Sequence, residues 1–93
     1  MTTKVALIIG AGDAIGSAIA RKFSQRGLTI CATRRNGDKL KPLIEEISET
    51  GRFAHGFACD ARDEDATENL FAKIEKEIGE IDVVVFNVGA NVP

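Results

Sequence analysis

Hydrophobic positions along the chain fall into four short, nearly continuous runs. The runs cover residues 5–9, 28–33, 53–59 and 82–87. Continuous apolar runs of this length are typical of strands that are buried on both faces of a parallel sheet. In the stretches between the runs, apolar residues recur every three or four positions. These stretches predict amphipathic helices, because residues at that spacing share one face of a helix.

Each predicted helix carries one apolar stripe and is followed by a glycine. The stripes consist of Ile15, Ala18, Ile19 and Phe23, then Leu40, Leu43, Ile44 and Ile47, and finally Leu70, Phe71, Ile74 and Ile78. Gly27, Gly51 and Gly79 follow them, and glycine is favoured just beyond the last turn of a helix. We expect the second helix to begin near Gly37, with Pro42 in its first turn, where a missing N–H costs little.

The order β-α-β-α-β-α-β predicts an α/β fold, a Rossmann-like doubly wound parallel sheet. Right-handed crossovers favour the strand order 3-2-1-4, in which the first two helices share one face and the third lies on the other. The last strand is then an edge, and one of its faces lacks a helix. Because an exposed apolar edge invites pairing, we expect the sheet to be partial and its edge to be covered.

Composition narrows the range of partners. The 93 residues are 44% hydrophobic and carry a net charge of −2, which provides no broad basic surface for nucleic acid or an anionic membrane. No apolar run approaches the roughly 20 residues that span a bilayer, and no secretory signal opens the chain. Cys31 and Cys59 lie in apolar runs without metal-ligand spacing, which indicates reduced core residues. We expect a cytoplasmic protein without a metal, membrane or nucleic-acid partner.

Three glycines, Gly10, Gly12 and Gly16, lie between the first predicted strand and the first helix. Gly10 would form a tight turn, Gly12 would let phosphates approach the backbone, and Gly16 would let the helix pack closely on the strand. A helix N-terminus that faces such a turn favours a pyrophosphate. The spacing is one residue longer than the ordinary dinucleotide fingerprint, but its place in a βαβ unit favours a nucleotide site over a simple turn.

Other nucleotide loops compete with this interpretation. A P-loop requires Lys followed by Ser or Thr after its last glycine, whereas Gly16 is followed by Ser17 and Ala18. A site for a methyl donor also uses glycines after a first strand, usually with an acid at the end of the second strand. The chain has Arg34 and Arg35 at that position, which disfavours a methyl donor without excluding it.

The same two arginines indicate which dinucleotide fits. An acid about 20 residues beyond the loop would accept hydrogen bonds from the ribose hydroxyls of NAD. Arg34 and Arg35 stand there instead, and guanidinium groups match phosphate with paired, charge-assisted donors. The pair predicts NADP as cofactor and disfavours NAD, with ordinary solvated loop charge as the alternative.

Together these motifs resemble the N-terminal half of a classical short-chain dehydrogenase/reductase. Residues 9–16 (IGAGDAIG) are similar to the loop Thr-Gly-x-x-x-Gly-x-Gly of that family, with Ile9 in place of the Thr and Ala14 in place of the middle Gly. Residues 59–61 (CDA) resemble a turn whose Asp accepts from the adenine amino group. Residues 81–89 (IDVVVFNVG) resemble a segment that ends in Asn-Asn-Ala-Gly.

The resemblance covers essentially the whole chain and adds Ile15, Asp60, Ala61, Asn87 and Gly89 to the candidate site. Asp60 could instead cap the third helix or begin a turn, and Asp13 could cap the first helix. Asn87 and Gly89 could be turn residues with positive φ. The candidate cofactor-binding residues are Gly10, Gly12, Asp13, Ile15, Gly16, Arg34, Arg35, Asp60, Ala61, Asn87 and Gly89.

The resemblance also implies a reaction, in which hydride passes between NADP(H) and a carbonyl or alcohol substrate. In the family a Ser polarises the carbonyl, and a Tyr followed four residues later by Lys supplies the proton. This chain contains no Tyr, so we name no catalytic residue and expect no turnover from it alone. We interpret residues 1–93 as the dinucleotide-binding half-domain of such an oxidoreductase, truncated at its C-terminal end and part of a homo-oligomer. The alternative is a non-catalytic NADP(H)-binding module or sensor.

Overall fold

The structure of the chain, a computed structural model, describes residues 3–11 and 14–87. In order, its elements are β1 (Lys4–Ile9), α1 (Ala14–Gln25), β2 (Thr29–Arg34), a 3-10 helix η1 (Gly37–Leu40), α2 (Lys41–Glu49), β3 (Ala54–Ala58), α3 (Glu64–Glu77) and β4 (Glu80–Phe86). The predicted order of strands and helices is confirmed. None of the helices in these ranges is long and apolar enough to cross a membrane.

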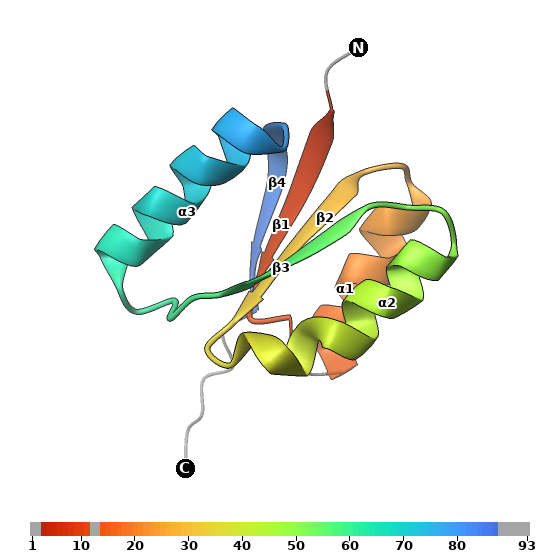
Figure 1. Ribbon diagram of the computed structural model, residues 1–93, viewed down its shortest axis with the longest axis horizontal. Helices are drawn as coiled ribbons and strands as arrows, with labels where there is room; N and C mark the ends of the chain where they lie inside the picture. Colours follow the sequence, from red (N-terminus) through yellow and green to blue (C-terminus); the bar gives the residue numbers. More distant parts are fainter. Residues whose placement is uncertain (1–2, 12–13, 88–93) are drawn as a thin grey trace.

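The four strands of these ranges form one parallel sheet in the order β3-β2-β1-β4, as predicted. Helices α1 and α2 lie on one face of the sheet and α3 lies on the other (Figure 1). The fold is therefore the predicted Rossmann-like α/β arrangement. Because the strands are parallel, the segments that follow them emerge at the same edge, where ligands bind in open α/β sheets.

Each face of the sheet has its own hydrophobic core. The core under α1 and α2 contains Ala6, Ile8, Ala11, Ala20, Ile30, Ala32, Leu40, Leu43 and Ile47. The core under α3 contains Val5, Leu7, Ile9, Cys31, Leu70 and Ile74. Successive residues of β1 thus enter opposite cores, which explains why its sequence is apolar throughout.

The buried stripe of α1 differs from the prediction. Ile15 is 65% exposed and Ala18 is also exposed, so neither belongs to the core. The fully buried positions are Gly16, Ala20 and Ser24, while Ile19 and Phe23 are half-buried beside them. Small residues spaced four apart let the helix axis come close to the sheet, and the larger apolar side chains then pack on the flank of this contact.

The two cysteines are free, but only one is a core residue in the full sense. Cys31 is completely buried in β2, and burial raises the pKa of its thiol to about 12. Cys59 is half-buried, with its Sγ 3.9 Å from the carbonyl of Asp60. The thiol of Cys31 therefore stays protonated at neutral pH, which makes it a poor nucleophile.

Strand β4 is an edge of the sheet within the described ranges, since its ladder partner there is β1. Val83 and Val85 are half-buried against the α1 side. Val84 and Phe86 are 36% and 63% exposed. Apolar surface is thus open beside an unpaired strand edge, as the hydrophobic pattern predicts.

Candidate functional site

The segment after β1 turns sharply and is fastened to the end of β2. Gly10 has φ +89°, a conformation that L side chains rarely adopt, which confirms the turn expected at this glycine. The amides of Gly10 and Ala11 both donate to the carbonyl of Thr33, each at 2.9 Å. The candidate residues Gly12, Asp13 and Gly89 lie outside the described residues.

Gly16 brings the first turn of α1 against this loop. A Cβ at Gly16 would lie 2.7 Å from both the Cα of Ala11 and the carbonyl oxygen of Gly10. It would also lie 2.9 Å from Nδ2 of Asn87. Only a residue without a side chain allows this approach, so the close packing expected at Gly16 is present. Ile15, the neighbouring candidate, lies exposed in the same turn of the helix.

Asn87 joins the end of β4 to the same loop. Its side-chain Nδ2 donates to the carbonyl of Gly10 at 3.0 Å, and its backbone amide donates to the carbonyl of Ile9 at 2.8 Å. No non-glycine residue among the described ones has a positive φ, so Asn87 is not the left-handed turn residue of the alternative interpretation. Its amide instead fixes the position of the loop carbonyl.

The ends of β2 and β3 bring the candidate charges together. The amide of Cys59 donates to the carbonyl of Arg34 at 3.0 Å, which brings the segment after β3 beside the segment after β2. As a result, Nε of Arg35 lies 3.9 Å from Oδ2 of Asp60. Arg34 is half-buried, while the side chain of Arg35 is 69% exposed. Ala61 packs against the core under α3.

Arg62 binds the Asp60 carboxylate through three donors. Its backbone amide and its Nε donate to Oδ1 at 3.0 and 3.2 Å, and its Nη2 donates to Oδ2 at 3.2 Å. These hydrogen bonds stabilise the charged carboxylate and lower the pKa of Asp60 to about 2. Sequence reasoning missed Arg62, although its position two residues after the aspartate is the spacing at which an Asp side chain commonly accepts from the backbone.

Asp60 does not cap α3, so the capping role weighed for it is wrong, but it does begin a turn, in which the amide of Asp63 donates to the carbonyl of Asp60 at 3.0 Å. The N-cap is Asp63, whose side chain accepts from the amide of Ala66 at 3.0 Å. Glu64 and Asp65 follow in the first turn, where negative charge is favoured by the helix dipole. Asp60 therefore has no capping role and stays at the sheet edge with Arg35 and Arg62.

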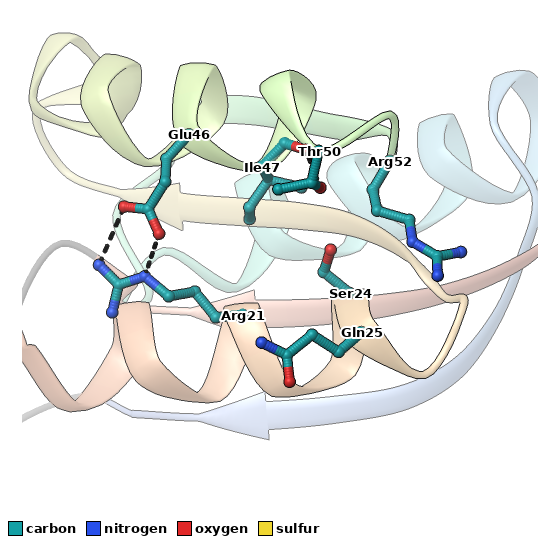
Figure 2. Close-up of a pocket in the computed structure, with 7 residues that line it drawn as sticks. All are labelled: Arg21, Ser24, Gln25, Glu46, Ile47, Thr50 and Arg52. Atoms are coloured by element: carbon teal, nitrogen blue, oxygen red, sulfur yellow. Dashed lines mark hydrogen bonds and ion pairs between the residues drawn. The ribbon is translucent and has the colours of Figure 1, made fainter.

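A separate cavity of about 280 Å³ lies between α1 and α2 (Figure 2). Its lining consists of Arg21, Ser24, Gln25, Glu46, Ile47, Thr50 and Arg52. The Arg21 guanidinium donates to both carboxylate oxygens of Glu46, and Figure 2 shows this pair at one side of the cavity. The cavity lies at the C-terminal half of α1, whereas the candidate site is at the N-terminal turn of that helix.

The chemistry at the sheet edge suits an anionic ligand. It combines the N-terminal turn of α1, a glycine turn and the guanidinium groups of Arg34 and Arg35. Within residues 3–11 and 14–87, no cluster of His, Cys, Asp and Glu side chains could hold a metal ion.

Known proteins share this sequence pattern. A family profile described as "short chain dehydrogenase" matches residues 4–93. A 2,3-dihydro-2,3-dihydroxybenzoate dehydrogenase from Bacillus subtilis is 39% identical over 82 residues, which are 88% of this chain and 31% of the relative. The chain thus spans about a third of the length of the curated relatives it matches.

Solved structures show the same likeness. A short-chain dehydrogenase from Rhodopseudomonas palustris superposes with a TM-score of 0.90 at 43% identity, covering 96% of this chain and 42% of its own. A metagenomic short-chain oxidoreductase in complex with NADP superposes with a TM-score of 0.83 at 33% identity. The match covers 90% of this chain and 38% of the oxidoreductase. On its sequence and its fold, the chain belongs to the short-chain dehydrogenase family.

Proposed function

We propose that the chain is the cofactor-binding part of an NADP-dependent short-chain oxidoreductase that acts on a carbonyl or alcohol. The observation that carries this proposal is the position of Arg34 and Arg35. Arg34 ends β2 and Arg35 follows it, at the same end of the sheet as the glycine turn. A cofactor whose ribose carries no 2′-phosphate would require an acid there. A related oxidoreductase in complex with NADP supports the same choice over NAD.

The residues at this edge fit such a cofactor. Gly10 and Gly16 bring no Cβ to the place where the described part of the loop meets the first turn of α1, beside which a pyrophosphate would bind. Arg34 and Arg35 would hold the 2′-phosphate, and Asp60 with Ala61 would face the adenine. The remaining proposed contacts are Gly12, Asp13, Ile15, Asn87 and Gly89.

When bound, NADPH supplies the hydride, and this chain supplies position and charge. The sequence contains no Tyr, so we propose that this chain binds the cofactor without turning over a substrate. Residues outside these 93 would bind the substrate, and would donate a proton to a carbonyl that is reduced or accept one from an alcohol that is oxidised. We assign no catalytic residue within them.

A double substitution tests the cofactor assignment. Arg34→Ala with Arg35→Ala should weaken NADPH binding by about 10- to 100-fold, because charge-assisted hydrogen bonds to the 2′-phosphate are lost. NADH, which lacks that phosphate, should change by less than about threefold. Equilibrium titration of each cofactor measures both effects, and the chain has neither Trp nor Tyr to interfere with NADPH fluorescence.

The matched control is Arg26→Ala with Arg52→Ala, which removes the same charge from exposed positions outside the candidate site. Both cofactors should then bind as they do to the unsubstituted chain. An equal loss of NADH and NADPH affinity in the Arg34 and Arg35 variant would contradict the NADP assignment.

Phe86 and Val88 depart from the family's Asn-Asn-Ala-Gly segment, which favours a second candidate function, a non-catalytic NADP(H)-binding module or sensor. The two candidates differ in the sequence of the complete gene product. A Tyr followed four residues later by Lys, downstream of residue 93, would support the oxidoreductase. A Phe at that Tyr position would support the binding module.

We further propose that the protein is a cytoplasmic homo-oligomer and that the outer edge of β4 is covered, either by another copy or by the remainder of the protein. The exposure of Val84 and Phe86 beside that edge supports a covered edge, and the two free cysteines suit a reducing compartment. Light scattering gives the oligomeric state, and hydrogen exchange reports on the β4 amides. A monodisperse monomer with rapidly exchanging β4 amides would contradict the oligomer.

A further inference from the structure

The Asp60 carboxylate lies between two guanidinium groups that hold it unequally. Arg62 donates to both carboxylate oxygens, with its side-chain nitrogens at 3.2 Å. Arg35 approaches Oδ2 to 3.9 Å, which is beyond hydrogen-bond distance. Arg62, which was not among the candidate residues, is therefore the principal partner of Asp60, which was.

We propose that Arg62 is a positioning residue for cofactor choice: by occupying the Asp60 carboxylate, it leaves Arg35 available for the 2′-phosphate of NADP. The inference rests on the proposed NADP site. It adds a specificity determinant that acts through Asp60, without requiring that Arg62 touch the cofactor.

Local geometry explains why Arg62, and not Arg35, takes the carboxylate. The backbone amide of Arg62 already donates to Oδ1 of Asp60 at 3.0 Å, so the two residues share one tight turn. The guanidinium then closes on both oxygens as a fork, a geometry that Arg forms with carboxylates more readily than a single-donor contact. Arg35 comes from a different segment, and its Nε stays 3.9 Å from the carboxylate.

The negative charge of Asp60 would affect both Arg35 and a nearby phosphate. An aspartate without a partner beside Arg35 would attract that guanidinium and would repel a phosphate dianion. An aspartate is charged near neutrality with or without a partner, since its ordinary pKa is 3.8, so the negative charge of Asp60 persists beside Arg35 unless a cation pairs with it. Arg62, which lies in the same turn as Asp60, provides that cation.

Substitution of Arg62 by Gln tests the proposal in the 93-residue chain. Arg62→Gln should raise the Kd of NADPH by about three- to tenfold, as expected for one uncompensated charge at short range in solvent. The Kd of NADH should change by less than about twofold. Arg52→Gln makes the same charge change at an exposed position outside the candidate site and should leave both Kd values unchanged.

A second variant separates action through Asp60 from direct contact with the phosphate. The readout is the ratio of the NADH Kd to the NADPH Kd, because an adenine contact of Asp60 is common to both cofactors and cancels. In the background Asp60→Asn there is no carboxylate to occupy. Adding Arg62→Gln to that background should therefore leave the ratio within about twofold of that of Asp60→Asn alone.

Each outcome of these titrations has one meaning. If Arg62→Gln lowers the ratio as much in the Asp60→Asn background as in the unsubstituted chain, then Arg62 binds the phosphate itself, and the proposal is overturned. An unchanged ratio in Arg62→Gln, with an unsubstituted chain that prefers NADPH, would overturn it while the NADP assignment stands. An unsubstituted chain that does not prefer NADPH would overturn both. Thermal unfolding followed by circular dichroism checks that each variant is folded.

Discussion

The side-chain amide of Asn87 donates a 3.0 Å hydrogen bond to the carbonyl of Gly10, across a separation of 77 residues in the chain. The contact joins the last residue described in the structure to the turn that follows the first strand. Since Gly10 also donates to Thr33, the ends of β1, β2 and β4 meet at one backbone turn. The geometry of the glycine loop thus depends on residues far along the chain.

Removing this contact should loosen the loop. Asn87→Ala should lower the free energy of unfolding by about 1 kcal/mol, the usual net value of one hydrogen bond. Asn87→Asp should cost more at neutral pH, because a carboxylate would face the Gly10 carbonyl. Below about pH 4 the Asp side chain gains a proton to donate, and its deficit relative to Ala should shrink.

Urea unfolding of the two Asn87 variants at neutral pH and at about pH 3 measures these differences. If Asn87→Asp were as stable as Asn87→Ala at neutral pH, the side chain would not face the carbonyl, and the hydrogen bond to Gly10 would be refuted.

The closeness of α1 to the loop predicts an unusual sign for a glycine substitution. In an exposed helix Ala is more favourable than Gly by about 1 kcal/mol. Gly16→Ala should instead destabilise the protein by about 1–3 kcal/mol, since the new Cβ would lie 2.7 Å from backbone atoms of Ala11 and Gly10. Equilibrium unfolding in urea gives the sign directly.

The control for this substitution is Gly56→Ala in β3. A Cβ there would meet Ile44 at 3.4 Å, an ordinary van der Waals distance, so the change should stay within about 0.5 kcal/mol of the unsubstituted protein. A stabilising Gly16→Ala would show that the helix does not approach the loop so closely.

Thr33 offers a route to higher stability. It is fully buried, and its Oγ1 is the buried side-chain oxygen without a hydrogen-bond partner among the described residues. Thr33→Val replaces this hydroxyl with a methyl group of similar size and should raise the free energy of unfolding by about 1 kcal/mol. Thr29→Val on the same strand, where the residue is 8% exposed, is the comparison and should gain less.

Chemical denaturation measures the free energy of unfolding of Thr33→Val and Thr29→Val. A loss of stability in Thr33→Val would mean that Oγ1 makes a hydrogen bond in solution.

The Asp60 and Arg62 pair predicts a dependence on pH that needs no cofactor. The pKa of Asp60 is lowered from its usual 3.8 to about 2, chiefly by the hydrogen bonds from Arg62. A lowered folded-state pKa stabilises the protein above the unfolded value, and this contribution is lost as the pH falls from about 4 to about 2. Arg62→Gln should remove it, so the difference in stability between the two proteins should shrink across that window.

Carboxyl chemical shifts in an NMR titration report the Asp60 pKa itself, which should return toward 3.8 in Arg62→Gln. Glu46→Gln, which breaks the exposed pair with Arg21 between α1 and α2, should leave the Asp60 titration unchanged. An Asp60 carboxyl that titrates near 3.8 in the unsubstituted chain would refute the three-donor arrangement.

The hydrophobic pattern was sufficient for the element order, the parallel sheet and the strand order 3-2-1-4. The apolar run at residues 5–9 lies in a strand buried on both faces, whereas the run in β4 leaves alternate residues exposed. Right-handed crossovers leave few ways to connect such parallel strands. The sequence also predicted the turn at Gly10 and the two arginines at the C-terminal end of β2. Each of these features depends only on one residue and its neighbours in the chain.

Only the tertiary structure decided the contacts between segments. It turned Gly16, Ala20 and Ser24 toward the sheet in place of Ile15, made Asp63 the cap of α3, and set Arg62 against Asp60. Periodicity reports which face of a helix is apolar, but how closely that face approaches the sheet depends on the smallest side chains on it. The partner of a charged side chain depends in turn on the turn geometry and strand register, which form only when the sheet assembles.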